Sequence, residues 1–361
     1  MSLRTRARCI TPPYLLEHLL TSSDPEVRAA AARTLAGSVE LQVKREVTTS
    51  LAPQAAESVG GARSIYDAQH QEATSGPLVR GEDDPAVADT SVNQAFDGLG
   101  VTRQFYADVL GRDSIDGNGG PLNGYVHYGR AFNNAFWDGS QMVFGDGDGQ
   151  VFADFTGSLD VIGHELTHGV TEALAGLEYH LQPGALNESI SDVFGSLVKQ
   201  FARNQTADEA DWLIGDDIFT PDFAGDALRS LKAPGTAYDN PTFGKDQQPA
   251  HMDDFVVLPD TAAGDWGGVH TNSGIPNHAF YLVATAIGGY AWEAAGRIWF
   301  EALAASTPKT DFAQFARNTL TRATLVFGES SSQAQAVRDG WSQVGITIDA
   351  PGSTQAASPV E

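Results

Sequence analysis

The chain has few groups with which to cross-link itself or to bind polyanions. Cys9 is the only cysteine among 361 residues, so an intrachain disulfide cannot form. Only 22 Lys and Arg stand against 46 Asp and Glu, which leaves a formal net charge of −24. This charge repels phosphate groups, and we therefore expect neither a nucleic acid nor a membrane as a partner. The excess acids are typical of a solvated surface, although a few could bind divalent cations.

Long apolar runs are missing as well. No segment approaches the ~20 consecutive apolar residues that a membrane-spanning helix requires. Residues 1–20 carry Arg4, Arg6 and Arg8 but no unbroken apolar core, which differs from the pattern of a secretory signal peptide. Together with the lone cysteine, this pattern predicts a protein that is cytoplasmic or is exported by a non-classical route. We expect the protein to be a monomer.

The patterns that are present divide the chain into four parts. Residues 1–55 hold two amphipathic stretches, and residues 56–175 form a β-rich part that ends in the expected helix 159–174. Within it, short β-type segments alternate with glycine turns from residue 63 to about residue 157. Residues 176–348 carry apolar side chains at helical spacing, and residues 349–361 have the composition of a flexible tail. The expected strands are 124–128 and 140–144, and the expected helices are 159–174, 187–201, 274–287, 292–303, 311–324 and 331–344. The predicted fold class is α+β, with a β-rich N-terminal lobe, a mainly helical C-terminal lobe and a cleft between them.

The segment His164-Glu165-Leu166-Thr167-His168 carries the clearest chemical signal. Residues four apart lie on one face of a helix, so His164 and His168 can bind the same metal ion. Glu165 then projects beside that metal, where its carboxylate can take a proton from water. Taken alone, the pentapeptide also fits a solvated amphipathic helix.

A second helical segment supplies a third ligand. Nineteen residues separate His168 from Glu188, and two histidines with one glutamate leave a fourth position open for water, as in a catalytic zinc site. Asp192 lies on the same helix face as Glu188 and can accept the N–H of a ligand imidazole. In the alternative interpretation, Glu188 and Asp192 only favour the helix dipole, but this leaves the two-histidine helix unexplained.

Several motifs resemble, in the right order, those of the thermolysin family of zinc metallopeptidases. They correspond to that family's substrate-edge strand, its two zinc-binding helices and its second catalytic histidine. The matching segments are 133–137, 141–147, 163–171, 184–188 and 267–274. The similarity extends from about Arg63 to Val344 and implies a two-lobed thermolysin-like fold with the zinc site in the cleft.

The resemblance assigns a role to individual residues. It implies one Zn²⁺ bound by His164, His168 and Glu188, with Glu165 as the general base on the attacking water. His270 and Tyr179 match the two groups that stabilise the oxyanion, although Tyr179 alone would fit a packing role.

Further matches concern the groups around these residues. Asp265, five residues before His270, matches the residue that orients that histidine. Asp192 and Asn187 match residues that hold the ligand imidazoles.

The resemblance also implies where a peptide substrate binds. Asn134 and the backbone of Ala135 would bind the substrate main chain along a strand edge, and Arg229 would bind a carbonyl on the leaving-group side. The six residues that match the specificity pocket are all apolar, which predicts cleavage before a bulky hydrophobic residue. These residues are Phe152, Phe155, Val161, Ile214, Ile218 and Leu228. Each of them would also fit an ordinary core position.

The acidic residues of the family's double calcium site are only partly present. Asp160, Asp211 and Asp216 match ligands of that site, but Lys199 and Leu213 stand where two further acids are expected. An ammonium group among these carboxylates can replace the cation electrostatically, so we expect the double calcium site to be lost. A single calcium site elsewhere is still compatible with the sequence, and the glycine-rich turn 145–149 is a candidate for it.

The N-terminal residues resemble the short prosegment of protealysin-like members of the family. Cys9–Leu16 carries this resemblance, and residues 1–55 are accordingly expected to occupy the cleft until the chain is cut near 48–61. Pro12-Pro13 would stiffen the segment against attack. The Cys9 thiolate could bind the zinc, or the thiol could simply be buried or exposed. Peptide or protein substrates, the chain's own prosegment and a dedicated protein inhibitor are the candidate partners.

The sequence therefore predicts a zinc-dependent neutral endopeptidase that is made as a proenzyme. Three other functions would fit parts of the sequence: a metal-binding scaffold without turnover, a zinc aminopeptidase and a structural protein. The intact Glu165, Tyr179 and His270 argue against the first, and the absence of a motif for binding a free N-terminus argues against the second. Only the acidic surface favours the third.

Overall fold

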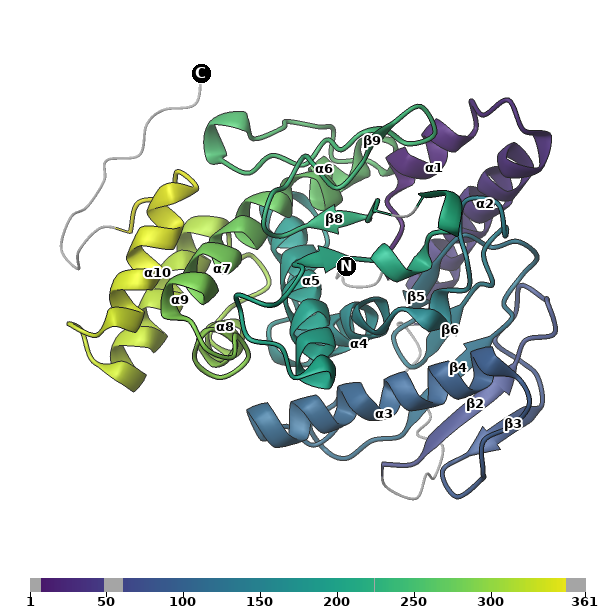
Figure 1. Cartoon of the computed structure of the whole chain (residues 1–361), viewed down its shortest axis with the longest axis horizontal. Coiled ribbons are helices and arrows are strands. Elements are labelled where there is room, and N and C mark those ends of the chain that lie inside the picture. Colours follow the sequence, from purple (N-terminus) through teal and green to yellow (C-terminus); the bar gives the residue numbers. More distant parts are fainter. Residues whose placement is uncertain (1–7, 49–60, 224, 349–361) are drawn as a thin grey trace.

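The computed structural model describes residues 8–48, 61–223 and 225–348. It has a β-sheet lobe, a central pair of helices and a C-terminal helical lobe (Figure 1). The helices are α1 (Pro13–Leu19), α2 (Pro25–Thr48), α3 (Thr90–Leu110), α4 (Leu159–Leu174), α5 (Leu181–Arg203), α6 (Asp265–Asn272), α7 (Gly274–Ile287), α8 (Ala294–Ala304), α9 (Phe312–Phe327) and α10 (Ser332–Gln343). The strands are β1 (Arg8–Cys9), β2 (Arg63–Asp67), β3 (Leu78–Gly81), β4 (Leu122–Val126), β5 (Ala135–Trp137), β6 (Met142–Phe144), β7 (Leu213–Ile214), β8 (Arg229–Ser230), β9 (Asp239–Asn240) and β10 (Gly244–Lys245).

The main sheet has six strands in the order β1-β5-β6-β4-β2-β3. Strand β1 pairs antiparallel with β5, with Arg8 opposite Trp137 and Cys9 opposite Phe136. The N-terminal segment, residues 8–48, therefore provides the outermost strand on this side of the sheet. Its helices α1 and α2 lie at the end of the molecule near β5, coloured purple in Figure 1.

Helices α4 and α5 cross with their backbones in contact. A Cβ atom on Gly195 would lie 2.4 Å from the carbonyl oxygen of Asp160, and one on Gly163 would lie 3.1 Å from the Cα atom of Gly195. Both helices are almost entirely buried between the sheet lobe and the C-terminal helices. The absence of a side chain at these two glycines lets the helices approach closely enough for side chains of α4 and α5 to share one site.

The C-terminal lobe is a layer of helices around aromatic side chains. The indole rings of Trp299 and Trp341 are stacked with their centroids 6.0 Å apart, and Trp341 Nε1 donates a hydrogen bond to Thr319 Oγ1 at 2.9 Å. Phe315 lies edge-on to both rings. Burial of these large rings, with the Trp341 N–H hydrogen-bonded, holds α8, α9 and α10 against one another.

The structure confirms the predicted α+β class and the order of a β-rich region followed by helices. Helices 159–174 and 274–287 have the predicted bounds. Among the described residues, no helix is both long and apolar enough to cross a bilayer. The expected tail at 349–361 and most of the linker at 48–61 lie outside the described residues.

Two predictions about secondary structure were wrong. The region 63–157 was expected to contain only short strands and turns, but it includes the 21-residue helix α3. Gly98 and Gly100 interrupt its apolar pattern, and Gly98 is needed because a Cβ there would lie 2.3 Å from Ile162 Cδ1. Helix α5 begins at Leu181 and not at 187. Pro183 does not interrupt it, because the proline lies in the first turn, where a backbone N–H has no partner within the helix and its absence costs nothing.

We predict that Gly195→Ala separates α4 from α5. The new methyl group has no space beside Asp160, and overpacking of this kind typically costs ~1–3 kcal/mol of the free energy of unfolding. Urea denaturation should show this loss, and metal analysis should show less bound metal per chain. Gly157→Ala is the matched control, because its Cβ would meet no atom closer than 3.7 Å. Equal stability and metal content in both variants would contradict the role of this crossing.

Candidate metal centre

Three predicted ligands meet between α4 and α5. His164 and His168 come from α4 and Glu188 from α5, all three are fully buried, and one ligand atom of each lies within 4.8 Å of the others. His164 Nε2 is 3.5 Å from Glu188 Oε2, and His168 Nε2 is 3.5 Å from Glu188 Oε1. The helical spacing of the two histidines and the crossing of the helices together produce this cluster.

The donor set fits a catalytic zinc ion. His164 Nε2 and Glu188 Oε2 are buried and make no hydrogen bond within the described part of the chain. A buried polar atom without a partner is costly, and a bound cation would satisfy both atoms. Two imidazole nitrogens and one carboxylate oxygen, with room for a fourth ligand, are typical of zinc hydrolases.

The other ring nitrogen of each histidine is fixed by a hydrogen bond. His164 Nδ1 lies 2.8 Å from Asp192 Oδ1, and His168 Nδ1 lies 2.8 Å from Asn187 Oδ1 and 2.9 Å from Ser191 Oγ. These partners place the proton on Nδ1 and leave Nε2 to face the metal position. Asp192 and Asn187 lie where the sequence analysis expected them.

Asp192 also binds the side chain of Arg229. The guanidinium donates from Nε to Oδ2 and from Nη2 to Oδ1, both at 2.8 Å, and Asn277 Nδ2 donates to Oδ2 at 2.9 Å. Burial raises the pKa of Asp192, but Arg229 and His164 outweigh it and lower the pKa to about 2. The carboxylate is therefore ionised and connects His164 with Arg229, to which it binds as a bidentate pair.

Glu165 lies beside the metal position with one oxygen held and one available. Its Oε2 accepts the backbone N–H of Trp137 at 2.9 Å, and its Oε1 is buried without a hydrogen bond among the described residues. Burial raises the pKa of this carboxyl group to about 8, although His164 opposes the shift. The hydrogen bond to Trp137 places Glu165 directly against the edge strand β5.

His270 and Tyr179 face the opposite side of the cluster. His270 Nε2 is 3.6 Å from Glu188 Oε2 and 3.3 Å from the Tyr179 hydroxyl, which also hydrogen-bonds Glu188 Oε1. Asp265 accepts from both His270 Nδ1, at 2.6 Å, and the His270 backbone N–H, at 2.8 Å. Burial lowers the pKa of His270, but Asp265 and Glu188 raise it to about 9, which favours an imidazolium that donates from Nε2.

A left-handed turn positions this histidine. Residues 265–268 at the start of α6 all have positive φ, with 85° at Gly267 and 78° at Gly268. A Cβ on Gly267 would lie 2.4 Å from Leu181 Cδ2, so glycine is required there for space as well as for conformation. The turn brings the Asp265 carboxylate back over the first regular residues of the helix.

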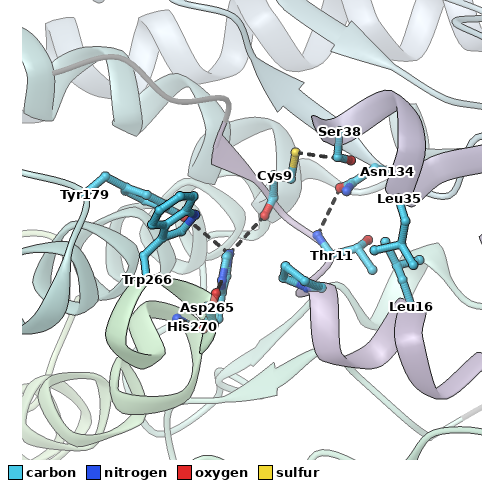
Figure 2. A pocket seen from close by; sticks show the side chains of 11 residues that line it. Cys9, Thr11, Leu16, Leu35, Ser38, Asn134, Tyr179, Asp265, Trp266 and His270 are labelled. Atoms are coloured by element: carbon cyan, nitrogen blue, oxygen red, sulfur yellow. Dashed lines mark hydrogen bonds and ion pairs between the residues drawn. The ribbon is translucent and has the colours of Figure 1, made fainter. Parts of the chain in front are cut away.

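The expected substrate edge is occupied by the N-terminal segment (Figure 2). Ile10 N donates to the carbonyl of Ala135 at 3.2 Å, and Thr11 N donates to Asn134 Oδ1 at 3.0 Å. Arg229 Nη1 donates to the carbonyl of Ile10 at 3.0 Å. Asn134, Ala135 and Arg229 thus bind one extended backbone, which belongs to the protein itself.

The Cys9 thiol does not face the metal centre, although a thiolate bound to zinc was one of the expectations. Its carbonyl oxygen lies 3.2 Å from His270 Nε2, whereas its Sγ lies 3.9 Å from Ser38 Oγ on α2 (Figure 2). The two groups point in opposite directions, so the side chain faces α2 and the main chain faces the metal centre. The expectation of a thiolate on the metal does not agree with this orientation.

The six apolar residues expected in the specificity pocket are all buried in the hydrophobic core. Leu228 N donates to the carbonyl of Ile214 across β7 and β8, and the rings of Phe152 and Phe155 are 5.6 Å apart. Ile10 is fully buried and belongs to the same apolar cluster. The residues in question are Phe152, Phe155, Val161, Ile214, Ile218 and Leu228.

Lys199 occupies the centre of the acidic cluster near the C-terminal end of α5. Its Nζ lies 2.8 Å from Asp160, 3.1 Å from Asp211 and 3.0 Å from Asp216. It also donates to the carbonyl oxygen of Leu213 at 2.8 Å. An ammonium group therefore fills the space among the carboxylates. In the turn 145–149, Asp146 and Asp148 are already engaged by His127 and by backbone N–H groups.

Sequence reasoning missed Asn277 and Ser191 as parts of the centre. Asn277 is a single amide in the otherwise apolar start of α7, and this isolated polar residue at a buried position could have identified it. Ser191 lies next to Asp192 and carries no separate signal. Asn277 holds Asp192, which contacts His164, and Ser191 hydrogen-bonds His168 directly.

Comparisons with known proteins agree with this geometry. A family model described as the thermolysin metallopeptidase catalytic domain matches residues 31–172, and one described as the thermolysin metallopeptidase alpha-helical domain matches residues 175–346. A solved structure of the precursor of protealysin, a metalloproteinase from Serratia proteamaculans, superposes with a TM-score of 0.85 at 48% identity. The superposition covers 94% of this chain and 100% of the other.

Curated relatives cover nearly the whole chain. An extracellular metalloprotease of Pectobacterium carotovorum subsp. carotovorum is 46% identical over 96% of this chain and 99% of its own. Protease PrtS of a Photorhabdus strain is 45% identical over 94% of this chain and 92% of its own. The cytoplasmic location expected from the sequence was wrong, because the first of these relatives is named as extracellular.

The two family models together match most of the chain. The two relatives are 46% and 45% identical to it over nearly its full length. The predicted resemblance is therefore confirmed. The chain belongs to the thermolysin family of metallopeptidases.

Proposed function

We propose that the protein is a zinc-dependent endopeptidase that cleaves peptide bonds before bulky hydrophobic residues. The observation that carries the proposal is the fully buried cluster of His164, His168 and Glu188, with Glu165 held beside it against the edge strand β5. A metal centre next to a strand edge can present the backbone of an extended peptide to an activated water.

His164 Nε2, His168 Nε2 and the Glu188 carboxylate would hold the zinc. When bound, Zn²⁺ supplies a Lewis acid that polarises a carbonyl group and lowers the pKa of water. Glu165 Oε1 accepts the proton of the attacking water and passes it to the leaving amine, because it is the carboxylate oxygen without a partner of its own. The hydrogen bond from Trp137 N to Oε2 keeps that carboxylate oriented.

His270 and Tyr179 stabilise the oxygen on which negative charge develops. Asp265 holds the His270 ring and favours its protonated form, so Nε2 donates to that oxygen. The Tyr179 hydroxyl lies 3.3 Å from the same nitrogen and can donate from the adjacent position. Asn134 and Ala135 bind the substrate backbone and Arg229 binds the carbonyl beyond the scissile bond.

The specificity follows from the apolar residues around Leu228. A side chain that enters between β7–β8 and the rings of Phe152 and Phe155 is removed from water, which favours large apolar residues by ~25 cal/mol per Å² of apolar area. No charged group among the six expected pocket residues would favour a polar side chain.

We predict that Glu165→Gln abolishes hydrolysis of a blocked peptide with Leu after the scissile bond. Loss of the general base should lower kcat by roughly 10²–10⁴-fold with little change in zinc content. The assay uses protein whose N-terminal segment has been cut away by limited proteolysis, and a zinc chelator should abolish the wild-type activity reversibly.

Glu172→Gln on the same helix α4 is the matched control and should retain activity. A peptide with Asp in place of Leu should be a poor substrate for the wild type. Full activity in Glu165→Gln, or in chelated protein free of metal, would contradict the proposed chemistry.

We also infer that the N-terminal segment is an inhibitory prosegment. It pairs with β5 and uses the groups assigned to the substrate, namely Asn134, Ala135 and Arg229. A tethered segment acts at an effective concentration in the millimolar range, so it competes strongly with a free peptide.

A chain that begins at Gly61 should therefore have a kcat/KM at least roughly tenfold above that of the intact full-length chain. Circular dichroism and metal content of the shortened chain establish that it is folded. Equal kcat/KM values for the two folded forms would refute inhibition by the segment.

We infer further that Lys199 replaces a calcium ion as the positive charge among Asp160, Asp211 and Asp216. Its Nζ lies within 3.1 Å of an oxygen of each carboxylate, and Asp160 is fully buried. The lysine charge lowers the pKa of Asp160 against the opposing effect of its burial.

Lys199→Met should cost roughly 3–5 kcal/mol of the free energy of unfolding, because it leaves the Asp160 carboxylate buried without its partner. Arg203→Met is the control, since Arg203 is an exposed partner of Asp211 and its loss should cost at most ~1 kcal/mol. Adding calcium should leave the wild-type denaturation midpoint unchanged. Similar losses in both variants would contradict the role of Lys199.

The named location of the Pectobacterium relative leads us to infer that this chain also acts outside the cytoplasm.

A further inference from the structure

The direction of the N-terminal segment in the cleft matches that of a substrate. The Cys9 carbonyl oxygen is 3.2 Å from His270 Nε2, and that nitrogen is 3.6 Å from the metal-facing oxygen of Glu188. This contact places the Cys9 carbonyl at the metal centre. The next carbonyl, that of Ile10, is bound by Arg229 on the other side.

The nitrogen of the same peptide bond is held as well. Ile10 N donates to the carbonyl of Ala135 at 3.2 Å, and the following Thr11 N donates to Asn134 Oδ1 at 3.0 Å. The Cys9–Ile10 bond thus has its carbonyl at the oxyanion groups and its amine on the side of Arg229. Both ends of the bond are fixed by groups that the proposed function uses for substrates.

Glu165 lies on the acyl side of this bond. Its Oε2 binds the N–H of Trp137, and Trp137 is the β5 partner of Arg8, the residue before Cys9. Helix α4, which carries Glu165, contacts β1 directly. Ile10 itself is fully buried in the hydrophobic core, as the residue after a scissile bond should be.

We propose that the protein hydrolyses its own Cys9–Ile10 peptide bond in cis. The inference rests on the proposed endopeptidase function of the same centre. One water molecule adds across the bond: its oxygen becomes part of a new Cys9 carboxylate, and the C–N bond breaks. Both protons of the water end on the Ile10 nitrogen, the first of them passed through Glu165, so that the products are a carboxylate and an ammonium group. Oxidation states do not change, and the solvent is the only co-reactant.

The fold explains why such a cut would not immediately free the cleft. Downstream of Ile10, Pro12 begins the turn into α1, whose Leu15, Leu16 and Leu19 are buried against the rest of the protein. The new N-terminus at Ile10 therefore stays anchored after hydrolysis, whereas on the other side of the cut the described residues Arg8 and Cys9 form only the two-residue strand β1. The cut therefore releases the part of the segment that ends at Cys9 before the part that begins at Ile10.

The test uses the zinc-loaded full-length protein. Samples are quenched in acid over time and analysed by mass spectrometry for a new N-terminus at Ile10, in ordinary water and in H₂¹⁸O. We expect this N-terminus in the wild type, at a rate independent of protein concentration, with one ¹⁸O atom in the peptide that ends at Cys9. Glu165→Gln should lose the cut.

A matched pair of variants tests whether the buried Ile10 side chain positions the bond for cleavage. Ile10→Val keeps an apolar residue and should keep the cut, whereas Ile10→Asp would bury a carboxylate in the apolar cluster and should slow the cut at least tenfold. Equal rates in the two variants would overturn the proposal.

The failure of this proposal differs from failure of the proposed function. If activated protein hydrolyses the blocked Leu peptide but the full-length chain never shows an Ile10 N-terminus, the self-cleavage is refuted and the endopeptidase stands. If neither bond is hydrolysed, both are refuted. A cut that persists in Glu165→Gln, or a rate proportional to protein concentration, would assign the cleavage to another protease or to a second molecule, and would overturn the proposal.

Discussion

The backbone contact between α4 and α5 at Gly163 and Gly195 is the constraint on which the rest of the site depends. Two helices that bring ligands to one ion must lie closer than ordinary side chains allow, because the imidazoles and the carboxylate are short. Ridges of larger residues would hold the axes about 8–10 Å apart. The glycines remove that barrier at the point where Asp160 and His164 of one helix face the other.

Once the helices are fixed, one buried carboxylate organises the polar side of the cleft. Asp192 accepts from His164, Arg229 and Asn277, which come from three different helices or strands. In a low-dielectric interior, an ionised group with all its acceptor positions used is rigid, and it transmits that rigidity to its partners. The two carboxylate oxygens of Asp192 thus set both the orientation of the His164 ring and the position of Arg229.

The sequence predicted the parts of the site that depend on local spacing. His164, Glu165 and His168 share a helix turn, and their arrangement follows from helical geometry alone. The bidentate pair between Asp192 and Arg229 joins residues 37 apart across a loop region, and no periodicity encodes it. The left-handed turn before His270 was likewise not predicted, because the two glycines of that turn indicate flexibility without showing which direction the chain takes. Helix α3 was missed because a glycine required for packing against Ile162 resembled a turn signal.

The pairing of β1 with β5 has a consequence for the order in which the protein is made. Ribosomes deliver the N-terminus first, so Cys9 and Ile10 emerge long before His164 or His270 is synthesised. The groups that contact the Cys9 and Ile10 backbones come from β5, β8 and α6, far apart in the chain, so the last of them to emerge completes the cleft. A nascent chain therefore contains the strand that occupies the cleft before His270, the last residue that contacts it, leaves the ribosome, so β1 is available as soon as the cleft is complete.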